Sequence, residues 1–211
     1  MTRKKVNLLF ITTLILVIIH FCGLLGMMSP YKETFILLTP LNLLITTVLL
    51  FINQKEFNRH FYIFCAFAFV AGYLIELAGV RSGFIFGEYT YGPSLGLKLF
   101  DVPLVMGLNW LMLTFSVGVI CNKLRTGKLV KCICGALLLV ILDFFIEPVA
   151  IESGFWSWKE GSVPAQNYIA WYAASIPLLL VFYSLKFNKD NEFAKALYLV
   201  QLVFFVLLSI F

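Results

Sequence analysis

Long apolar runs separated by short polar connections dominate this chain. A membrane-spanning helix needs roughly 20 mostly apolar residues, and seven runs approach or exceed that length. They are residues 6–28, 34–53, 61–80, 102–124, 129–151, 167–185 and 193–211. This pattern predicts an all-α integral membrane protein, with residues 1–211 forming one domain built as a bundle of about seven transmembrane helices.

The basic residues of the connections alternate between two sides of the predicted membrane. Because Lys and Arg are enriched in cytoplasmic connections, we expect the N-terminus in the cytoplasm and the C-terminus outside, in the cytoplasmic membrane of a prokaryotic cell. An arrangement with six spans would break the alternation. One side holds twelve basic residues: Arg3, Lys4, Lys5, Lys55, Arg59, Lys123, Arg125, Lys128, Lys131, Lys186, Lys189 and Lys195. The other holds four: Lys32, Arg81, Lys98 and Lys159.

The first apolar run also has features of a signal peptide, since Arg3, Lys4 and Lys5 precede it. Its apolar stretch is longer than that of most signal peptides, and no small-x-small cleavage site follows. We therefore expect this run to be kept as a membrane span.

Composition narrows the chemistry. The chain is 61% hydrophobic and 13% charged, whereas soluble domains are about 45–50% apolar and about 25% charged. The net charge of +5 follows from the topology, so we expect no nucleic-acid partner. The two histidines, His20 and His60, are too few for a membrane di-iron centre, and Cys132-x-Cys134 has no second pair to complete a metal site. We expect neither a metal nor another cofactor.

Three acidic residues lie inside the apolar runs, where a carboxylate is costly and usually functional. Asp143 and Glu147 are four residues apart, so they lie on one face of a helix. Glu76 lies near the end of another run. At about 1.5 Å per residue, all three fall within roughly 10–15 Å of the outer boundary. This pattern favours acid–base catalysis at membrane depth.

Two outer connections are rich in glycine and aromatic residues. Residues 81–101 and 152–165 are too polar for a membrane helix, yet too aromatic for simple solvated loops. We expect them to cap the outer mouth of the bundle, although an interfacial aromatic belt and ion pairs from the acids to Arg81 or Lys98 are alternatives. The candidate substrate-binding residues near this end are Trp110, Asn109, Tyr89, Tyr91, Trp156, Trp158, Asn167, Arg81 and Asp101.

A series of short motifs resembles the carotenoid biosynthesis membrane proteins, which include bacterial γ-carotene 1′-hydroxylases and archaeal bacterioruberin-pathway hydratases. The resemblance runs from about Glu76 to Trp171. It consists of Glu76-x-x-Gly79-x-Arg81-Ser82-Gly83-x-x-Phe86-Gly87-x-Tyr89-x-Tyr91, Leu95-Gly96, Val102-Pro103, Trp110, Asp143-x-x-x-Glu147-Pro148-Val149, Phe155-Trp156-x-Trp158, Pro164 and Asn167-Tyr168-x-x-Trp171. This chain has Glu147 where we expect Asp in many relatives.

The resemblance implies addition of water across the terminal 1,2 double bond of an acyclic carotenoid end, without a redox cofactor. The substrate would be γ-carotene or a lycopene-like carotenoid, reached from the membrane lipid. Such a reaction needs a neutral acid to protonate carbon and an ionised partner to stabilise the cation. Being deepest, Asp143 is our expected proton donor, with Glu147 or Glu76 as its partner.

Three other functions use similar residues. A carotenoid or isoprenoid cyclase or isomerase would form the same cation without adding water. A proton- or cation-coupled transporter would use the acids as a relay. A retinal-binding protein would need a lysine in the middle of the last span, but Lys195 is at the cytoplasmic end of that span.

Overall fold

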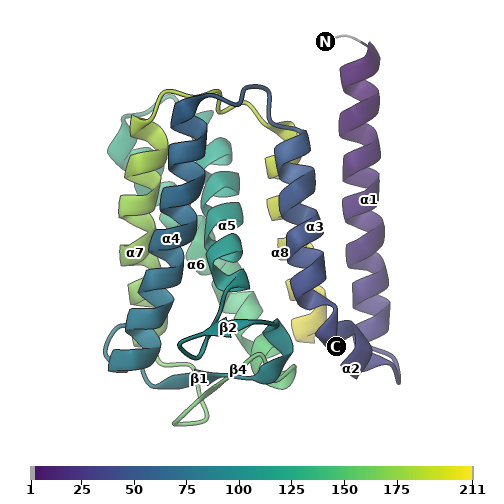
Figure 1. Cartoon of the computed structure of the whole chain (residues 1–211), viewed down its shortest axis with the longest axis vertical. Helices are drawn as coiled ribbons and strands as arrows, with labels where there is room; N and C mark the ends of the chain where they lie inside the picture. The colour runs from purple at the N-terminus through teal and green to yellow at the C-terminus, as the bar shows by residue number, and fades with distance from the viewer. Residues whose placement is uncertain (1–2, 211) are drawn as a thin grey trace.

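The computed structural model describes the backbone of residues 3–210 and the side chains of residues 7–210. Over this range the chain forms a bundle of α-helices with a small cap of short strands at one end (Figure 1). The helices are α1 (Arg3–Met27), α2 (Lys32–Leu37), α3 (Thr39–Ile52), α4 (Arg59–Ser82), α5 (Val105–Asn122), α6 (Lys128–Glu152), α7 (Ala165–Ser184) and α8 (Glu192–Ile210). The prediction of an all-α membrane protein is confirmed; Phe211, part of the last predicted span, lies outside the described residues.

The chain runs back and forth along the bundle, so the start of α1 and the end of α8 lie at opposite ends (Figure 1). Six helices among the described residues are long and apolar enough to cross a membrane. The second predicted span differs, because it consists of α2 and the shorter α3. Pro40 lies in the first turn of α3. Proline has no backbone N–H to donate to the preceding turn, and its ring would clash with a carbonyl of that turn. The helix therefore breaks at Leu38 rather than running straight through.

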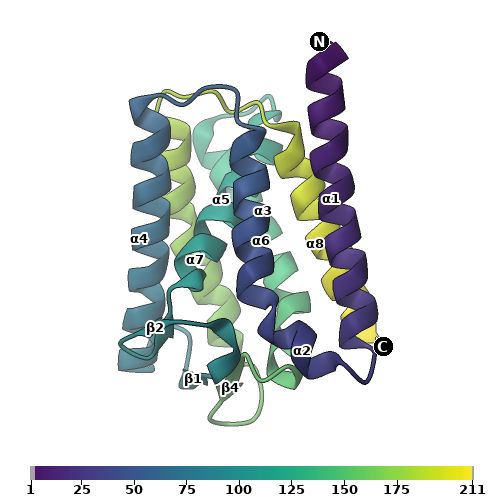
Figure 2. The same ribbon diagram turned by 45° about the vertical axis from the view of Figure 1, so that its right-hand side comes forward.

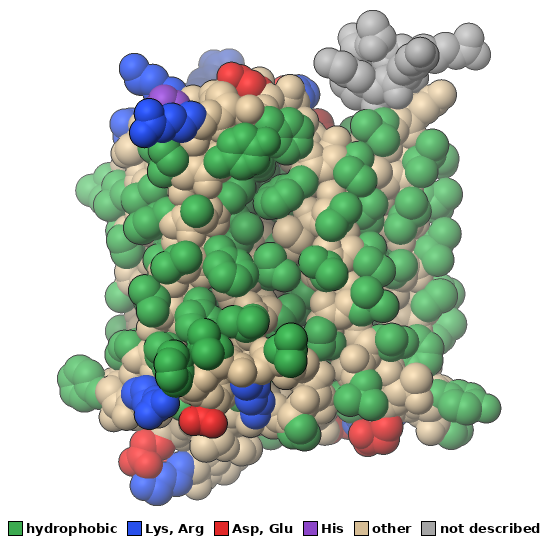
Figure 3. Space-filling view, viewed as in Figure 1, with side chains coloured by type: hydrophobic (Ala, Val, Ile, Leu, Met, Phe, Trp, Pro, Cys, Tyr) green, Lys and Arg blue, Asp and Glu red, His purple; other side chains and the backbone are tan. Residues whose placement is uncertain are grey.

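The surface has the banding expected of a multi-pass membrane protein. Figure 3 shows apolar side chains covering the middle of the face in view, with charged side chains at both ends. At the end where α4 begins, Asp190 accepts hydrogen bonds from Lys55 and Lys123 and joins three connections. At the opposite end, Lys32 pairs with Glu152 and Lys159 with Glu88, each at 2.5 Å.

The core is built around α5, most of whose side chains are buried between the other helices (Figures 1 and 2). In the half of the bundle nearer the basic end, phenylalanines from α4, α5, α7 and the last connection pack edge to face. Their ring centroids are 5.1 Å apart for Phe64 and Phe182, 5.6 Å for Phe115 and Phe182, and 5.9 Å for Phe61 and Phe187. These rings form one apolar cluster in this half of the core.

The predicted cap is present, and it contains strands that the sequence pattern did not predict. The elements are β1 (Tyr89–Tyr91), a 3-10 turn η1 (Pro93–Leu95), β2 (Lys98–Leu99), β3 (Val102–Pro103) and β4 (Trp156–Trp158). β1 pairs antiparallel with β4, and β2 pairs with β3. The first pairing joins the two glycine- and aromatic-rich connections into one layer over the bundle end (Figure 2).

Candidate active site

The three buried acids lie around one small cavity under the cap. Asp143 and Glu147 come from α6 and Glu76 from α4, and all three line it. Their exposed fractions are 1%, 2% and 3%, respectively. The cavity measures about 20 Å³, which is room for about one water molecule.

Glu76 is held by three hydrogen-bond donors. The hydroxyls of Tyr89 and Tyr91 donate to its Oε2 at 2.6 and 2.7 Å, and the indole Nε1 of Trp110 donates to its Oε1 at 2.8 Å. Burial raises the pKa of both tyrosines well above its usual value, and the nearby charge of Glu76 raises it further. The tyrosines therefore stay protonated, and their hydroxyls donate to Glu76.

The pairing of β1 with β4 brings four aromatic side chains to the acids. Tyr89 lies opposite Trp158, and Tyr91 lies opposite Trp156. Because side chains alternate across a strand, these four side chains share the inner face of the strand pair. The intervening Thr90 and Ser157 are exposed on the outer face, with their hydroxyls 3.2 Å apart. The repeats Tyr-Thr-Tyr and Trp-Ser-Trp are thus strands with one polar face and one face turned toward the acids.

Glu147 is likewise held by three donors. The indole nitrogens of Trp156 and Trp158 each donate to its Oε2 at 3.0 Å, and Nδ2 of Asn167 donates to its Oε1 at 3.1 Å. The same Asn167 nitrogen donates to Oδ2 of Asp143 at 2.9 Å. No other described residue hydrogen-bonds to Asp143, so its second oxygen has no protein partner. The three acids therefore differ: Glu76 and Glu147 each accept three hydrogen bonds, whereas Asp143 accepts one.

Two glycines on α4 let the site close. A Cβ at Gly72 would lie 2.2 Å from Cβ of Trp110, and one at Gly79 would lie 2.5 Å from the Phe86 ring. Gly72, Glu76 and Gly79 share one helix face by their spacing. Because Gly72 and Gly79 carry no side chain, α5 and the cap approach Glu76 closely.

An aromatic wall lies beside the acids. The rings of Trp110 on α5 and Trp171 on α7 stack with centroids 4.1 Å apart and planes 14° from parallel. Trp171, Phe86 and Met106 all line the cavity, although none was among our candidate site residues. Trp171 and Phe86 stand in the motifs of the family resemblance, which was the available signal. Met106 had none.

Most of the predicted site residues converge in the structure, and three do not. Asn109 is half-buried and lines none of the cavities described here. Arg81 is exposed and lies 5.9 Å from the Phe100 ring centroid. Asp101 is exposed in the loop between β2 and β3. Those that converge are Glu76, Tyr89, Tyr91, Trp110, Asp143, Glu147, Trp156, Trp158 and Asn167.

The ion pairs considered as an alternative role for the acids are absent from the described residues. Lys98 donates to the backbone carbonyl of Tyr91 at 2.6 Å, and the salt bridges present involve other acids. The described residues also contain no group of three or more His, Cys, Asp or Glu side chains placed to hold a metal ion.

Fold and site together define a multi-pass α-helical membrane protein with a buried carboxyl cluster beneath an aromatic cap. The chain belongs to the carotenoid biosynthesis protein family, whose profile matches residues 35–211. It is also similar to bisanhydrobacterioruberin hydratase of Haloarcula japonica, with 30% identity over 118 residues. That alignment covers 52% of this chain and 40% of the hydratase, so the chain matches less than half of that protein's length. No solved structure matches the chain.

Proposed function

We propose that this protein is a carotenoid hydratase that adds water across the terminal 1,2 double bond of an acyclic carotenoid end group. The observation that carries the proposal is the carboxyl cluster, in which two acids have a full set of donors and the third has a free oxygen beside a water-sized cavity. Membership of a carotenoid biosynthesis family and similarity to a hydratase support the choice of substrate class.

The hydrogen bonds support one assignment of protonation states. Carboxylates accept hydrogen bonds and cannot donate them, so the triple-donor shells of Glu76 and Glu147 suit their ionised forms. No Lys or Arg of the described residues lines the cavity, and three buried negative charges side by side would repel one another strongly. Asp143, with one donor, is therefore the acid that keeps its proton.

The reaction then proceeds by protonation of the alkene and addition of water, followed by return of the proton to Asp143. Asp143 transfers its proton to the less substituted carbon of the terminal double bond, leaving a tertiary carbocation and an Asp143 carboxylate. Water bonds to the cation and gives up a proton to Glu147. Transfer of that proton to Asp143, which shares the amide of Asn167 with Glu147, restores the starting state. The net change is addition of one water.

The surroundings of the cavity suit a cation in the reaction path. Charges fixed where positive charge develops lower the barrier, and Glu76 and Glu147 supply two of them. The stacked Trp110 and Trp171 present aromatic faces, each of which contributes about 0.5–2 kcal/mol to a nearby cation. An isoprenoid end group is larger than the cavity, so its binding requires the side chains around the acids to move apart.

Water capture, rather than cyclisation, is favoured by the polar lining. A cyclase must exclude water from its cation, whereas here three acids and Asn167 surround a space of about 20 Å³. A transporter is disfavoured because the buried acids of the described residues all lie at one end, while phenylalanines of α4, α5 and α7 pack together in the other half of the core. With the basic end in the cytoplasm, the site lies in the outer half of the membrane and the substrate reaches it from the lipid.

Expression in a host that accumulates γ-carotene or lycopene tests the proposal. We expect products heavier by one or two water molecules, formed with or without oxygen in the culture. Growth in heavy-oxygen water should label the new hydroxyl. Label arriving from dioxygen, or a cyclised product of unchanged mass, would exclude hydration.

A further inference from the structure

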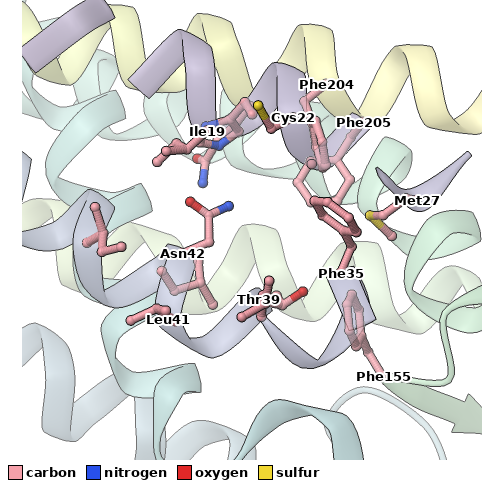
Figure 4. Close-up of a pocket in the computed structure, with 16 residues that line it drawn as sticks. Ile19, Cys22, Met27, Phe35, Thr39, Leu41, Asn42, Phe155, Phe204 and Phe205 are labelled. Carbon is pink, nitrogen blue, oxygen red and sulfur yellow. The ribbon is translucent and has the colours of Figure 1, made fainter. Parts of the chain in front are cut away.

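A second and larger pocket lies away from the acids, between α1, α3 and α8 (Figure 4). Its volume is about 250 Å³, and most of its lining is apolar, including Ile19, Met27, Phe35, Phe204 and Phe205. Figure 4 shows these side chains around one space, with Phe155 at its edge. Such a lining suits a hydrocarbon chain.

The pocket opens toward the membrane. Leu38 and Leu41 both line it and are 45% and 50% exposed, on the side that faces the apolar belt. On α1, Cys22 also lines the pocket and is exposed. A molecule dissolved in the lipid therefore has a direct path into the pocket.

Buried polar groups from three helices meet inside this apolar lining. Gln201 on α8 is only 5% exposed, and its Oε1 has no hydrogen-bond partner among the described residues. His20 on α1 is also 5% exposed, and its Nδ1 lies 2.9 Å from the Leu16 carbonyl. That contact places the proton of the neutral ring on Nδ1 and leaves Nε2 as an acceptor. Asn42 reaches into the same space from α3 (Figure 4).

These groups specify what kind of ligand the pocket recognises. An unpaired buried acceptor is costly, and Oε1 of Gln201 has no donor among the described residues. A hydroxyl supplies that donor and also accepts in return from an amide N–H. We propose that this pocket binds a long-chain apolar alcohol from the membrane, with its hydroxyl donating to Oε1 of Gln201 and its chain along the phenylalanines.

The pocket lies next to the carboxyl site without being part of it. Phe155 lines the pocket, while the next residue, Trp156, lines the acid cavity and donates to Glu147. The product of the hydration proposed above is one alcohol of this class. Binding itself requires no catalysis, so the inactive Asp143→Asn variant should bind as well as the original protein.

Photolabelling tests the site directly. The purified protein in lipid nanodiscs is exposed to a geranylgeraniol analogue with a diazirine in its chain, and labelled peptides are mapped by mass spectrometry. We expect labels on α1 and α8, displaced at least tenfold more effectively by geranylgeraniol than by the hydrocarbon of the same length. Equal displacement by the two competitors, or labels elsewhere, would overturn the proposal.

Matched variants separate recognition from folding. Gln201→Leu removes the unpaired oxygen while keeping the bulk, so we expect at least tenfold weaker alcohol binding with an unchanged or higher melting temperature. Thr114→Val is the control, since the Thr114 hydroxyl is also buried without a partner among the described residues but lies outside the pocket. Equal binding by both variants and the original protein would mean that Gln201 is a structural residue only.

A filling variant supplies an independent check. A Cβ at Gly23 would lie at an ordinary contact distance of 3.5 Å from the Phe204 ring, so the backbone accepts a side chain there. Gly23→Leu should fill the pocket and abolish labelling while leaving carotenoid hydration measurable. Unchanged labelling in this variant would place the ligand elsewhere.

Discussion

Replacing Asp143 by asparagine is the sharpest test of the carboxyl mechanism, because the structure predicts loss of activity without loss of stability. The carbonyl oxygen of the new amide can keep the hydrogen bond from Asn167 at the position of Oδ2. The new NH₂ group then takes the position of Oδ1, which has no protein partner among the described residues and lies beside the cavity. The fold therefore loses nothing, but the proton donor is gone.

Replacing Glu147 by glutamine should behave differently. Its Oε2 accepts two indole N–H groups and its Oε1 accepts Asn167, so an NH₂ group faces donors in either orientation. If the side-chain amide of Asn167 flips, its oxygen can accept from the new NH₂ group in one orientation. The same oxygen then also accepts the proton of Asp143, which is no longer free for the substrate. An unsatisfied buried donor costs about 1–3 kcal/mol, which lowers the melting temperature of a chain of this size by on the order of 2–10 °C.

The assay pairs turnover with stability for the same preparations. Hydrated carotenoid is quantified by liquid chromatography and mass spectrometry in a carotene-producing host, and unfolding is followed by tryptophan fluorescence of the purified variants. General acid catalysis is worth about 10²–10⁴-fold, so Asp143→Asn should lose at least that factor at an unchanged melting temperature. Asp101→Asn, at an exposed acid outside the site, is the matched control.

Two results would refute the reasoning. Near-normal hydration by Asp143→Asn would show that another group protonates the substrate. If the melting temperature of Asp143→Asn were as low as that of Glu147→Gln, Asp143 and Glu147 would not differ in the number of hydrogen bonds they accept.

Three further predictions concern packing, charge and topology. Gly72→Ala should destabilise the protein by about 1–3 kcal/mol, seen as a lower melting temperature, because its Cβ would lie 2.2 Å from Trp110; an unchanged melting temperature would mean that α4 and α5 are not so close. Hydrogen bonds from two lysines hold the pKa of Asp190 below its ordinary 3.8, so the stability it contributes is present above that value and is lost as the pH falls through the lowered pKa. Asp190→Asn should remove this part of the pH dependence, worth only about 0–1 kcal/mol for an exposed pair, and a curve parallel to the original would contradict the assignment. Reporter fusions at Asn58 and Lys159 should report cytoplasm and exterior respectively, and the same side for both would disprove seven crossings.

The sequence alone determined the membrane class, the apolar runs and the acid pair. Apolar runs of span length and the i, i+4 spacing of Asp143 and Glu147 are local properties, since a helix satisfies its backbone hydrogen bonds within itself. The break in the second span was also within reach, because Pro40 is visible in the sequence. We predicted a continuous span because hydropathy alone does not register a missing backbone donor.

Only the tertiary structure decided how the acids are differentiated. Tyr89 and Trp158 meet because two connections far apart in the chain pair in one register, and strand pairing is a non-local choice that neither connection shows by itself. The same holds for Asn167, whose single amide nitrogen bonds to both Asp143 and Glu147. Sequence spacing placed three carboxyls at one depth, but the donors that support two of them and leave Asp143 with one come from four separate segments brought together by packing.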